Sequence, residues 1–277
     1  MSKILITGAA GFIGFRLFKK LNAQYDVIGV DFNLKKKLDK NIISLDLLNE
    51  DKTSELIKKF QPNFVFHLAA YAGPPRNELN PKFAYKYNVE ILKSLLKSLS
   101  EDTKIFFPST DKIFEGKTYP DESNNLNPPS VHGKLKLICE DLIKNFNERY
   151  FIFRQPVIHS FGHYKQLTEM SGCSFIDKAI DDIRIGKKVK IFGNIKRCFV
   201  KVEELIFIYE KLITSDQYGT YNIASPLSSY YERLVNLCVE KKLDFKKSVI
   251  ETKGTTFPLE QNINCKKFEK TFNFKFS

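Results

Sequence analysis

The sequence predicts an α/β protein: a Rossmann-type, doubly wound parallel sheet with a smaller C-terminal lobe. Three observations indicate this fold. Short apolar segments alternate with helix-like stretches over the first 155 residues, a glycine-rich turn follows the first of these segments, and the alternation becomes less regular afterwards. Short, continuously apolar strands are typical of a sheet covered on both faces, and strands that alternate with helices predict parallel crossover connections.

The expected elements follow in chain order. Six strands, rich in Ile, Val and Phe, are expected over residues 3–7, 27–30, 42–45, 64–68, 104–107 and 150–153. Helices are expected between them over residues 12–23, 50–60, 81–99 and 131–146. Residues 115–130 are dense in Pro, Asn, Ser and Gly, which predicts a loop. Beyond Arg154 we expect a loop over 159–173, a helix over 174–185, a strand near 189–192 and a helix around 202–214.

Composition excludes several classes of protein. At 277 residues the chain can bury a large core without disulfides or metal. No apolar run is long enough for a membrane span. The five cysteines are scattered and form no CxxC pair, which disfavours disulfide frameworks and zinc clusters and favours a cytoplasmic location.

The net charge of +12 raises the question of nucleic acid, which attracts basic proteins through its phosphates. Only seven of the 44 basic residues are arginine, and the charges are spread along the chain. Lysines are typical of solvated faces, whereas arginine forks carry bidentate phosphate recognition. We therefore expect no nucleic-acid partner, and a small anionic ligand suits the charge as well.

The glycine-rich turn predicts a phosphate site. Gly8, Gly11 and Gly14 lie between the first strand and the first helix, where they allow a tight turn, a close approach to a pyrophosphate and close helix–strand packing. Asp31 follows 23 residues after Gly8, where its carboxylate can accept hydrogen bonds from ribose hydroxyls. The Asp31 carboxylate favours NAD, while the three lysines at 35–37 keep NADP as an alternative. The other interpretation is an ordinary tight turn and strand-end aspartate.

The spacing TGxxGxxG resembles the extended short-chain dehydrogenase/reductase superfamily, in particular its NAD-dependent nucleotide-sugar epimerases and reductases. Further segments match in order: LDL at 45–47, FHLAA at 66–70, and YNVE around Asn88. FFPSTDKIFEG at 106–116 closely resembles the dTDP-4-dehydrorhamnose reductases. The resemblance implies cofactor contacts from Gly8, Gly11, Phe12, Ile13, Gly14, Asp31, Asp46, Leu47, Leu68, Ala69, Ala70, Asn88 and Lys136.

The same resemblance implies a catalytic Ser/Thr, Tyr and Lys. Ser109 or Thr110 takes the first place, with Thr110 the closer match, and Lys136 takes the last, but His132 stands where the family has tyrosine. The ordinary pKa values of tyrosine and histidine are about 10 and about 6.5, and a nearby ammonium lowers that of histidine further. A neutral His132 is a competent base and a poor acid. The alternatives are that His132 only begins a helix, or that activity has been lost.

Substrate contacts are implied for Tyr71, Asp111, Arg154, Ser174 and Arg197, the last on the sugar diphosphate. Lys112 stands where dehydratases of the family need a glutamate, so dehydration is disfavoured. No metal is expected, because the four histidines lack ligand spacing with carboxylates.

The resemblance thus implies an NAD-binding domain over 1–155 and a mainly substrate-binding lobe over 156–277, with some segments returning to the main sheet. The expected function is 4-keto reduction or C4 epimerisation of a nucleotide-diphosphate sugar, for surface polysaccharide precursors. The alternative is a catalytically silent regulatory subunit that binds a dinucleotide or nucleotide sugar. The family often forms homodimers through the helices expected at 81–99 and 131–146.

Overall fold

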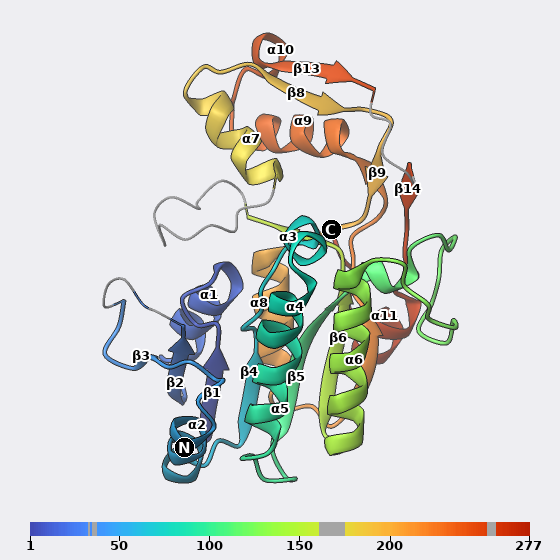
Figure 1. Ribbon diagram of the computed structural model, residues 1–277. Coiled ribbons are helices and arrows are strands. Elements are labelled where there is room, and N and C mark those ends of the chain that lie inside the picture. The colour runs from blue at the N-terminus through green and yellow to red at the C-terminus, as the bar shows by residue number, and fades with distance from the viewer. Residues whose placement is uncertain (33, 35–37, 161–174, 254–258) are drawn as a thin grey trace.

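A parallel sheet forms the centre of the protein (Figure 1). The computed structural model describes residues 1–32, 34, 38–160, 175–253 and 259–277. Within them the sheet has seven strands, in the order β11 (Gly219–Asn222), β6 (Tyr150–Gln155), β5 (Lys104–Thr110), β4 (Phe64–His67), β1 (Lys3–Thr7), β2 (Asp26–Asp31) and β3 (Ile42–Ser44). All neighbouring pairs are parallel. The predicted doubly wound parallel sheet is confirmed.

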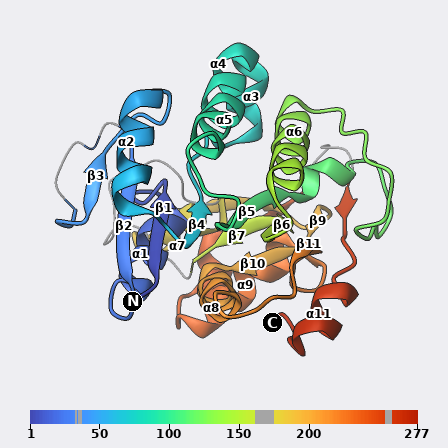
Figure 2. The same ribbon diagram turned by 90° about the horizontal axis from the view of Figure 1, so that it is seen from below.

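Helices cover both faces of the sheet, as Figure 2 shows from below. One face carries α1 (Phe12–Leu21), α8 (Val202–Leu212) and α11 (Lys266–Phe272). The other carries α2 (Glu50–Phe60), α4 (Pro81–Tyr85), α5 (Ile91–Leu96) and α6 (Val131–Phe146). Successive strand residues point to opposite faces, so Ile4 and Ile6 of β1 join one apolar core while Leu5 joins the other. This two-sided burial explains the continuously apolar strands.

The helix expected over 81–99 is divided into shorter pieces. The structure has α3 (Pro74–Leu79), α4, a π-helical turn η1 (Lys86–Glu90) and then α5. Prolines occupy the first positions of α3 and α4, where a missing amide costs nothing, and the Asn80 side chain caps α4 by accepting from the Phe83 amide at 3.2 Å. The segment 81–96 therefore stays helical, but it begins at a proline and contains one widened turn.

Strand β5 is longer than its apolar core predicts. The expected strand ended at residue 107, yet pairing with β6 continues through Ser109 with Arg154 and Thr110 with Gln155. The extra residues are polar but buried, so hydropathy did not mark them as strand. As a consequence, Ser109 and Thr110 lie in the sheet at its carboxyl edge.

The second lobe packs around its own small core, above the carboxyl edge of the sheet in Figure 1. It contains α7 (Phe175–Arg184), β8 (Val189–Phe192), α9 (Tyr230–Glu240), α10 (Phe245–Ser248) and β13 (Val249–Thr252). At the junction lie a three-stranded sheet of β12 (Ser228–Ser229), β9 (Lys196–Arg197) and β14 (Glu260–Gln261), and the pair β10 (Phe199–Lys201) with β7 (Val157–His159). The expected strand near 189–192 is confirmed, and the expected helices are α7 and α8 with slightly different ends. The domain division at residue 155 stays a prediction.

Candidate functional site

The glycine turn after β1 is packed too closely for side chains. Gly8 has a φ of +69°, and a Cβ added there would lie 2.7 Å from the Ala69 amide nitrogen. A Cβ on Gly14 would lie only 2.0 Å from the Gly8 carbonyl oxygen. Helix α1 begins after Gly11, which has no side-chain cap. Because a helix leaves its first amides without intrahelical acceptors, this turn offers hydrogen-bond donors to a phosphate group.

Asp31 is held against this turn at the end of β2. Its Oδ2 accepts a hydrogen bond from the Ala10 amide at 2.8 Å, and its Oδ1 accepts from the Phe32 amide at 2.7 Å. Burial raises the pKa of Asp31, opposed by these two bonds. A carboxylate has about four acceptor positions, so two remain for ribose hydroxyls. The structure therefore brings Asp31 and the glycine turn together, as the spacing predicts.

The remaining predicted cofactor residues lie along the same edge of the sheet. Asp46 follows β3, and its Oδ1 accepts from the Leu48 amide at 3.0 Å, with Leu47 buried beside it. Ala69, just after β4, donates its amide to Thr7 Oγ1 at 3.2 Å. Asn88 donates to the Ala84 carbonyl oxygen at 2.7 Å, so its amide is used within the helical segment. Also at this edge are Phe12 and Ile13, which begin α1, and Leu68 and Ala70, which follow β4.

Ser109 belongs to a buried charge network. Its hydroxyl donates to Glu140 Oε1 at 2.6 Å, and Arg154 binds both carboxylate oxygens of Glu140, through Nε at 3.1 Å and Nη2 at 2.8 Å. Burial would raise the pKa of Glu140, but the bonds and charge of Arg154 lower it below its ordinary value. Ser109 and Arg154 are thus committed to Glu140, and their roles toward a substrate stay predictions.

The hydroxyl of Thr110 makes longer hydrogen bonds than that of Ser109. Its Oγ1 accepts from the Lys112 amide at 3.2 Å, at the start of the 3₁₀ turn η2 (Asp111–Phe114), and lies 3.4 Å from Asp111 Oδ1. Of the two candidates on β5, Thr110 is therefore the one whose hydroxyl is not held by a strong short bond.

His132 and Lys136 lie one turn apart at the start of α6, and their side chains share one face. Lys136 is buried, donates through Nζ to the Pro108 carbonyl oxygen at 2.7 Å, and lies 4.4 Å from the centre of the Phe107 ring. Burial lowers the pKa of Lys136 to about 8. Burial, together with the charges of Lys136 and Lys112, lowers the pKa of His132 to about 4. The imidazole is therefore neutral at pH 7.

His132 also contacts a residue that the sequence did not single out. Its Nδ1 lies 3.1 Å from Oδ1 of Asn77, a fully buried residue of α3. The Asn77 amide nitrogen donates to the Tyr71 carbonyl oxygen at 2.8 Å. The predicted substrate residue Tyr71 thus contributes its backbone to the support of His132. Asn77 follows two prolines in a segment without apolar periodicity, so no sequence pattern marked it.

Asp111 and Arg197 lie on the side of the site that faces the second lobe. Asp111 is buried, and burial raises its pKa to about 6, opposed by the charges of Lys112 and Arg197. Arg197 donates through Nη1 to the carbonyl oxygens of Lys196 at 2.7 Å and Leu259 at 3.0 Å. Gln261 Nε2 donates to the Asp111 carbonyl oxygen at 3.1 Å. Strand β14 thereby contacts the turn η2, which directly follows β5.

Tyr230 at the start of α9 lies near enough to Asp111 and Arg197 for their charges to affect its phenol, and no sequence pattern singled it out. Burial raises the pKa of this phenol, and the Asp111 carboxylate raises it further, while Arg197 lowers it. A tyrosine in a region without recognisable motifs gave no signal. Ser174, the remaining predicted substrate residue, lies outside the described residues.

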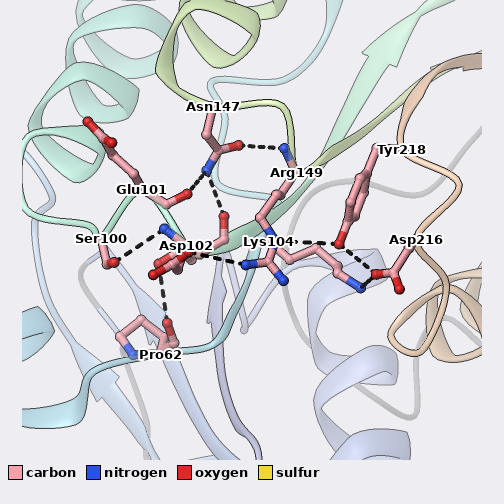
Figure 3. Close-up of polar contacts among 10 residues, drawn as sticks. Pro62, Ser100, Glu101, Asp102, Lys104, Asn147, Arg149, Asp216 and Tyr218 are labelled. Atoms are coloured by element: carbon pink, nitrogen blue, oxygen red, sulfur yellow. Dashed lines mark hydrogen bonds and ion pairs between the residues drawn. The ribbon is translucent and has the colours of Figure 1, made fainter.

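A hollow of about 580 Å³ lies at the opposite, amino edge of the sheet, away from every predicted site residue. It is lined by Met1, Ser2, Asn63, Phe64, Asp102, Lys104 and Arg149. Figure 3 shows that the charged groups there are bound to neighbours in the chain: Lys104 pairs with Asp216, and Arg149 pairs with Asp102 and contacts Tyr218. We therefore assign the functional site to the carboxyl edge.

Two kinds of site find no support in the described part of the chain. Residues 1–160 and 175–277, apart from the small gaps, bring together no three His, Cys, Asp or Glu side chains suited to a metal ion. Among the helices of that same part, none has the length and apolar character needed to cross a membrane.

The fold and this edge define a dinucleotide-binding protein of the Rossmann class. Residues 4–224 match the NAD dependent epimerase/dehydratase family, and the chain belongs to that family. A dTDP-4-dehydrorhamnose reductase of Aggregatibacter actinomycetemcomitans is 28% identical over 84% of this chain and 76% of that protein. Methionine adenosyltransferase 2 subunit beta of Danio rerio is 30% identical over 60% of this chain, which spans half of that relative's length.

Solved structures have the same fold. The dTDP-4-dehydrorhamnose reductase of Bacillus anthracis, in complex with NADP, has a TM-score of 0.83 at 22% identity and covers 100% of this chain and 94% of its own. The UDP-glucose 4-epimerase of Thermotoga maritima, with UDP-glucose, has a TM-score of 0.84 at 22% identity, covering 99% and 94%. Reductases and epimerases are thus matched equally well by the architecture.

Proposed function

We propose that the protein is an NAD(P)-dependent oxidoreductase or epimerase that acts on a nucleotide-linked sugar. One observation carries the proposal: the glycine turn with Asp31 lies at the same edge of one sheet as Thr110, His132 and Lys136. Ligands of doubly wound sheets bind at the carboxyl ends of the strands, where catalytic side chains and cofactor meet. Membership of the NAD dependent epimerase/dehydratase family supports the same function.

The residues at this edge fit a dinucleotide. Gly8 and Gly14 let the turn, the start of α1 and the end of β4 pack backbone against backbone, which brings the first amides of α1 to the edge where a pyrophosphate would bind, and Asp31 keeps acceptor capacity for the adenosine ribose. Asp31 favours NAD, because its carboxylate repels a 2′-phosphate, and NADP is the alternative. When bound, the nicotinamide supplies hydride transfer to or from a sugar carbon.

The side chains of this chain would position the sugar and move its proton. Thr110 orients the reacting sugar oxygen through its hydroxyl. Lys136 holds the nicotinamide ribose, and its pKa of about 8 keeps it mainly protonated at pH 7. His132 takes the place of the family's tyrosine as the group that exchanges the proton.

On the substrate side, we propose that Asp111 and Arg197 contact a nucleotide-diphosphate sugar from opposite sides of the junction between the sheet and the second lobe. The reaction is reduction of a 4-keto sugar or C4 epimerisation, in the synthesis of surface polysaccharide precursors in the cytoplasm. A homodimer through α4, α5 and α6 is part of the same proposal.

The test begins with binding. Calorimetry with NADH and NADPH should give saturable binding, tighter for NADH, and Asp31→Asn should reduce that preference by about tenfold. Spectrophotometry with 4-keto nucleotide sugars, and separation of epimers from UDP- and dTDP-sugars, then identifies the reaction. No binding of either dinucleotide at millimolar concentration would remove the proposal.

A second candidate is a catalytically silent subunit that binds a dinucleotide or nucleotide sugar and regulates a partner enzyme. Two observations favour it: the histidine in the tyrosine position, and the relative named as a subunit beta of methionine adenosyltransferase 2. The two candidates separate at His132. In an enzyme, His132→Ala should abolish turnover and His132→Tyr should retain or raise it, whereas a regulatory subunit binds its ligand equally well in all three forms.

A further inference from the structure

The hydrogen bonds of Asn77 fix which atom of its amide faces His132. The Tyr71 carbonyl oxygen can only accept, so the atom of Asn77 that lies 2.8 Å from it is the amide nitrogen. The atom 3.1 Å from His132 Nδ1 is then the Asn77 oxygen, which also can only accept. His132 Nδ1 must therefore carry the hydrogen of this bond.

We infer that Asn77 is a positioning residue that holds His132 as the Nδ1–H tautomer, with the lone pair on Nε2 directed to accept a proton from a sugar hydroxyl. This inference rests on the proposed function. It adds the protonation state of the resting site, because a ring with an acceptor in this place can take the proton when a hydroxyl is oxidised. The described residues make no hydrogen bond to Nε2, and His132 is partly exposed.

The charges around the ring support this assignment. Lys136, one turn further along α6, and Lys112, on η2, both face it, while the Glu78 carboxylate of α3 accepts from the Val131 amide at 2.6 Å. With a pKa of about 4, the ring is protonated in about one molecule in a thousand at pH 7. A neutral ring has a single N–H, and Asn77 uses it, so Nε2 has no hydrogen to donate to a substrate carbonyl.

The oxidation step is balanced in atoms and charge. His132 Nε2 would take the O–H proton as the C–O bond becomes C=O, and the hydride of the broken C–H bond would go to an oxidised nicotinamide when one is bound. In a net oxidation, the imidazolium formed then loses its proton to water, because its pKa is low. Net reduction of a ketone needs the imidazolium at the start. Epimerisation begins with the oxidation step and can return the same proton.

The ring tautomer can be measured directly, without cofactor or substrate. Long-range ¹H–¹⁵N correlation of the ¹⁵N-labelled protein at pH 7 should give Nδ1 the shift of a protonated nitrogen and Nε2 that of a lone-pair nitrogen, assigned to His132 by its loss in His132→Gln. Free histidine prefers the opposite tautomer, so Asn77→Ala should move the ratio toward Nε2–H by about tenfold. Asn77→Asp keeps an acceptor and should retain Nδ1–H.

Asn80→Ala is the matched control. Asn80 lies in the same segment and caps α4, but its side chain bonds the Phe83 amide and not His132. Its His132 signals should match those of the unmodified protein. An Nε2–H tautomer in the unmodified protein, or an unchanged tautomer in folded Asn77→Ala, overturns the inference. The first measurement needs no variant at residue 77 and so decides even if Asn77→Ala does not fold.

Kinetics tests the positioning role. With an NAD⁺-dependent oxidation and the reverse reduction measured on one nucleotide-sugar pair at one pH, Asn77→Ala should lower kcat by about tenfold in both directions with little change in KM, because the equilibrium constant fixes the ratio of the two. An unchanged kcat, or a loss that appears only as a higher KM, would contradict the positioning role. An Nδ1–H tautomer in a protein that binds neither NADH nor NADPH would instead retain the Asn77 assignment and remove the proposed function.

Discussion

The two edges of the central sheet differ in how much of the hydrogen-bonding capacity of their polar groups is already used. At the amino edge, Lys104 Nζ donates to the carbonyl oxygens of Ser215 at 2.7 Å and Ile213 at 3.0 Å. It also pairs with Asp216, while the Asn147 amide nitrogen donates to the Glu101 and Thr103 carbonyl oxygens at 2.9 Å (Figure 3). At the carboxyl edge, Asp31, Thr110 and His132 each keep acceptor capacity beyond the bonds they make.

The hollow at the amino edge is sizeable, yet the charged side chains of Lys104, Arg149 and Asp102 that line it are already bound within the chain. The carboxyl edge instead has groups whose hydrogen bonds fix their orientation without using all their capacity. The comparison teaches that unspent hydrogen-bonding capacity, held in place by buried neighbours, identifies the functional edge better than cavity volume does.

The largest expected loss of stability comes from breaking the buried ion pair beneath the carboxyl edge. The Arg154 and Glu140 side chains are 3% and 0% exposed and 2.8 Å apart. Replacing Arg154 with methionine leaves the Glu140 charge uncompensated, which should lower the free energy of unfolding by about 3–5 kcal/mol. Urea denaturation measures this. A loss below about 1 kcal/mol would mean that the network does not support the edge.

Gly14→Ala should have the next largest effect on stability and on NADH binding. Its Cβ would lie 2.0 Å from the Gly8 carbonyl oxygen, so backbone must shift at a cost of about 3 kcal/mol and the phosphate cradle should lose at least tenfold in NADH affinity. The matched control is Gly186→Ala, at a φ of +76° with nothing within 4 Å of the new Cβ. The control should cost about 1 kcal/mol and leave NADH binding unchanged. Equal NADH affinity in both variants would place the dinucleotide elsewhere.

The buried Asp111 predicts a pH-dependent effect. Burial raises its pKa from 3.8 to about 6, so between those values the folded state keeps a proton that the unfolded state has lost. Stability therefore falls as pH rises through this window. Asp111→Asn removes the penalty and should stabilise the protein by about 2 kcal/mol at pH 7, with little gain at about pH 3.5. A gain that is the same at both pH values in urea denaturation would contradict this cause.

The smallest effect is expected at the amino edge. Arg149 and Asp102 are 44% and 93% exposed, so Arg149→Ala should cost less than about 1 kcal/mol and should not change NADH binding. This variant tests the conclusion that the amino edge takes no part in binding. A tenfold loss of NADH affinity would show that the amino-edge hollow takes part in binding after all.

The sequence allowed the sheet and the tight glycine turn to be predicted because both depend on local patterns. Gly8, Gly11 and Gly14 at this spacing favour a turn without side chains, and apolar strands indicate a covered sheet. The end of β5 could not be predicted in the same way, because Ser109 and Thr110 are polar and their strand pairing depends on β6.

The residues that hold the site side chains in place were even harder to predict from the sequence. Asn77 meets His132 55 residues later in the chain, and Gln261 meets Asp111 across 150 residues. Such contacts depend on tertiary packing and leave no periodicity in the sequence. Arg154 illustrates the converse: its motif predicts a substrate contact, while the structure shows a side chain bound to Glu140, so the motif alone does not distinguish recognition from internal support.

The three-stranded sheet at the junction has a consequence for motion. Strands β12, β9 and β14 belong to three separate passages of the chain between the main sheet and the second lobe, and hydrogen bonds join them side by side (Figure 1). Because these three connections are hydrogen-bonded side by side, we expect them to move as one unit. Arg197 and Gln261 are paired within this sheet, so any motion of the lobe would carry the two side chains together.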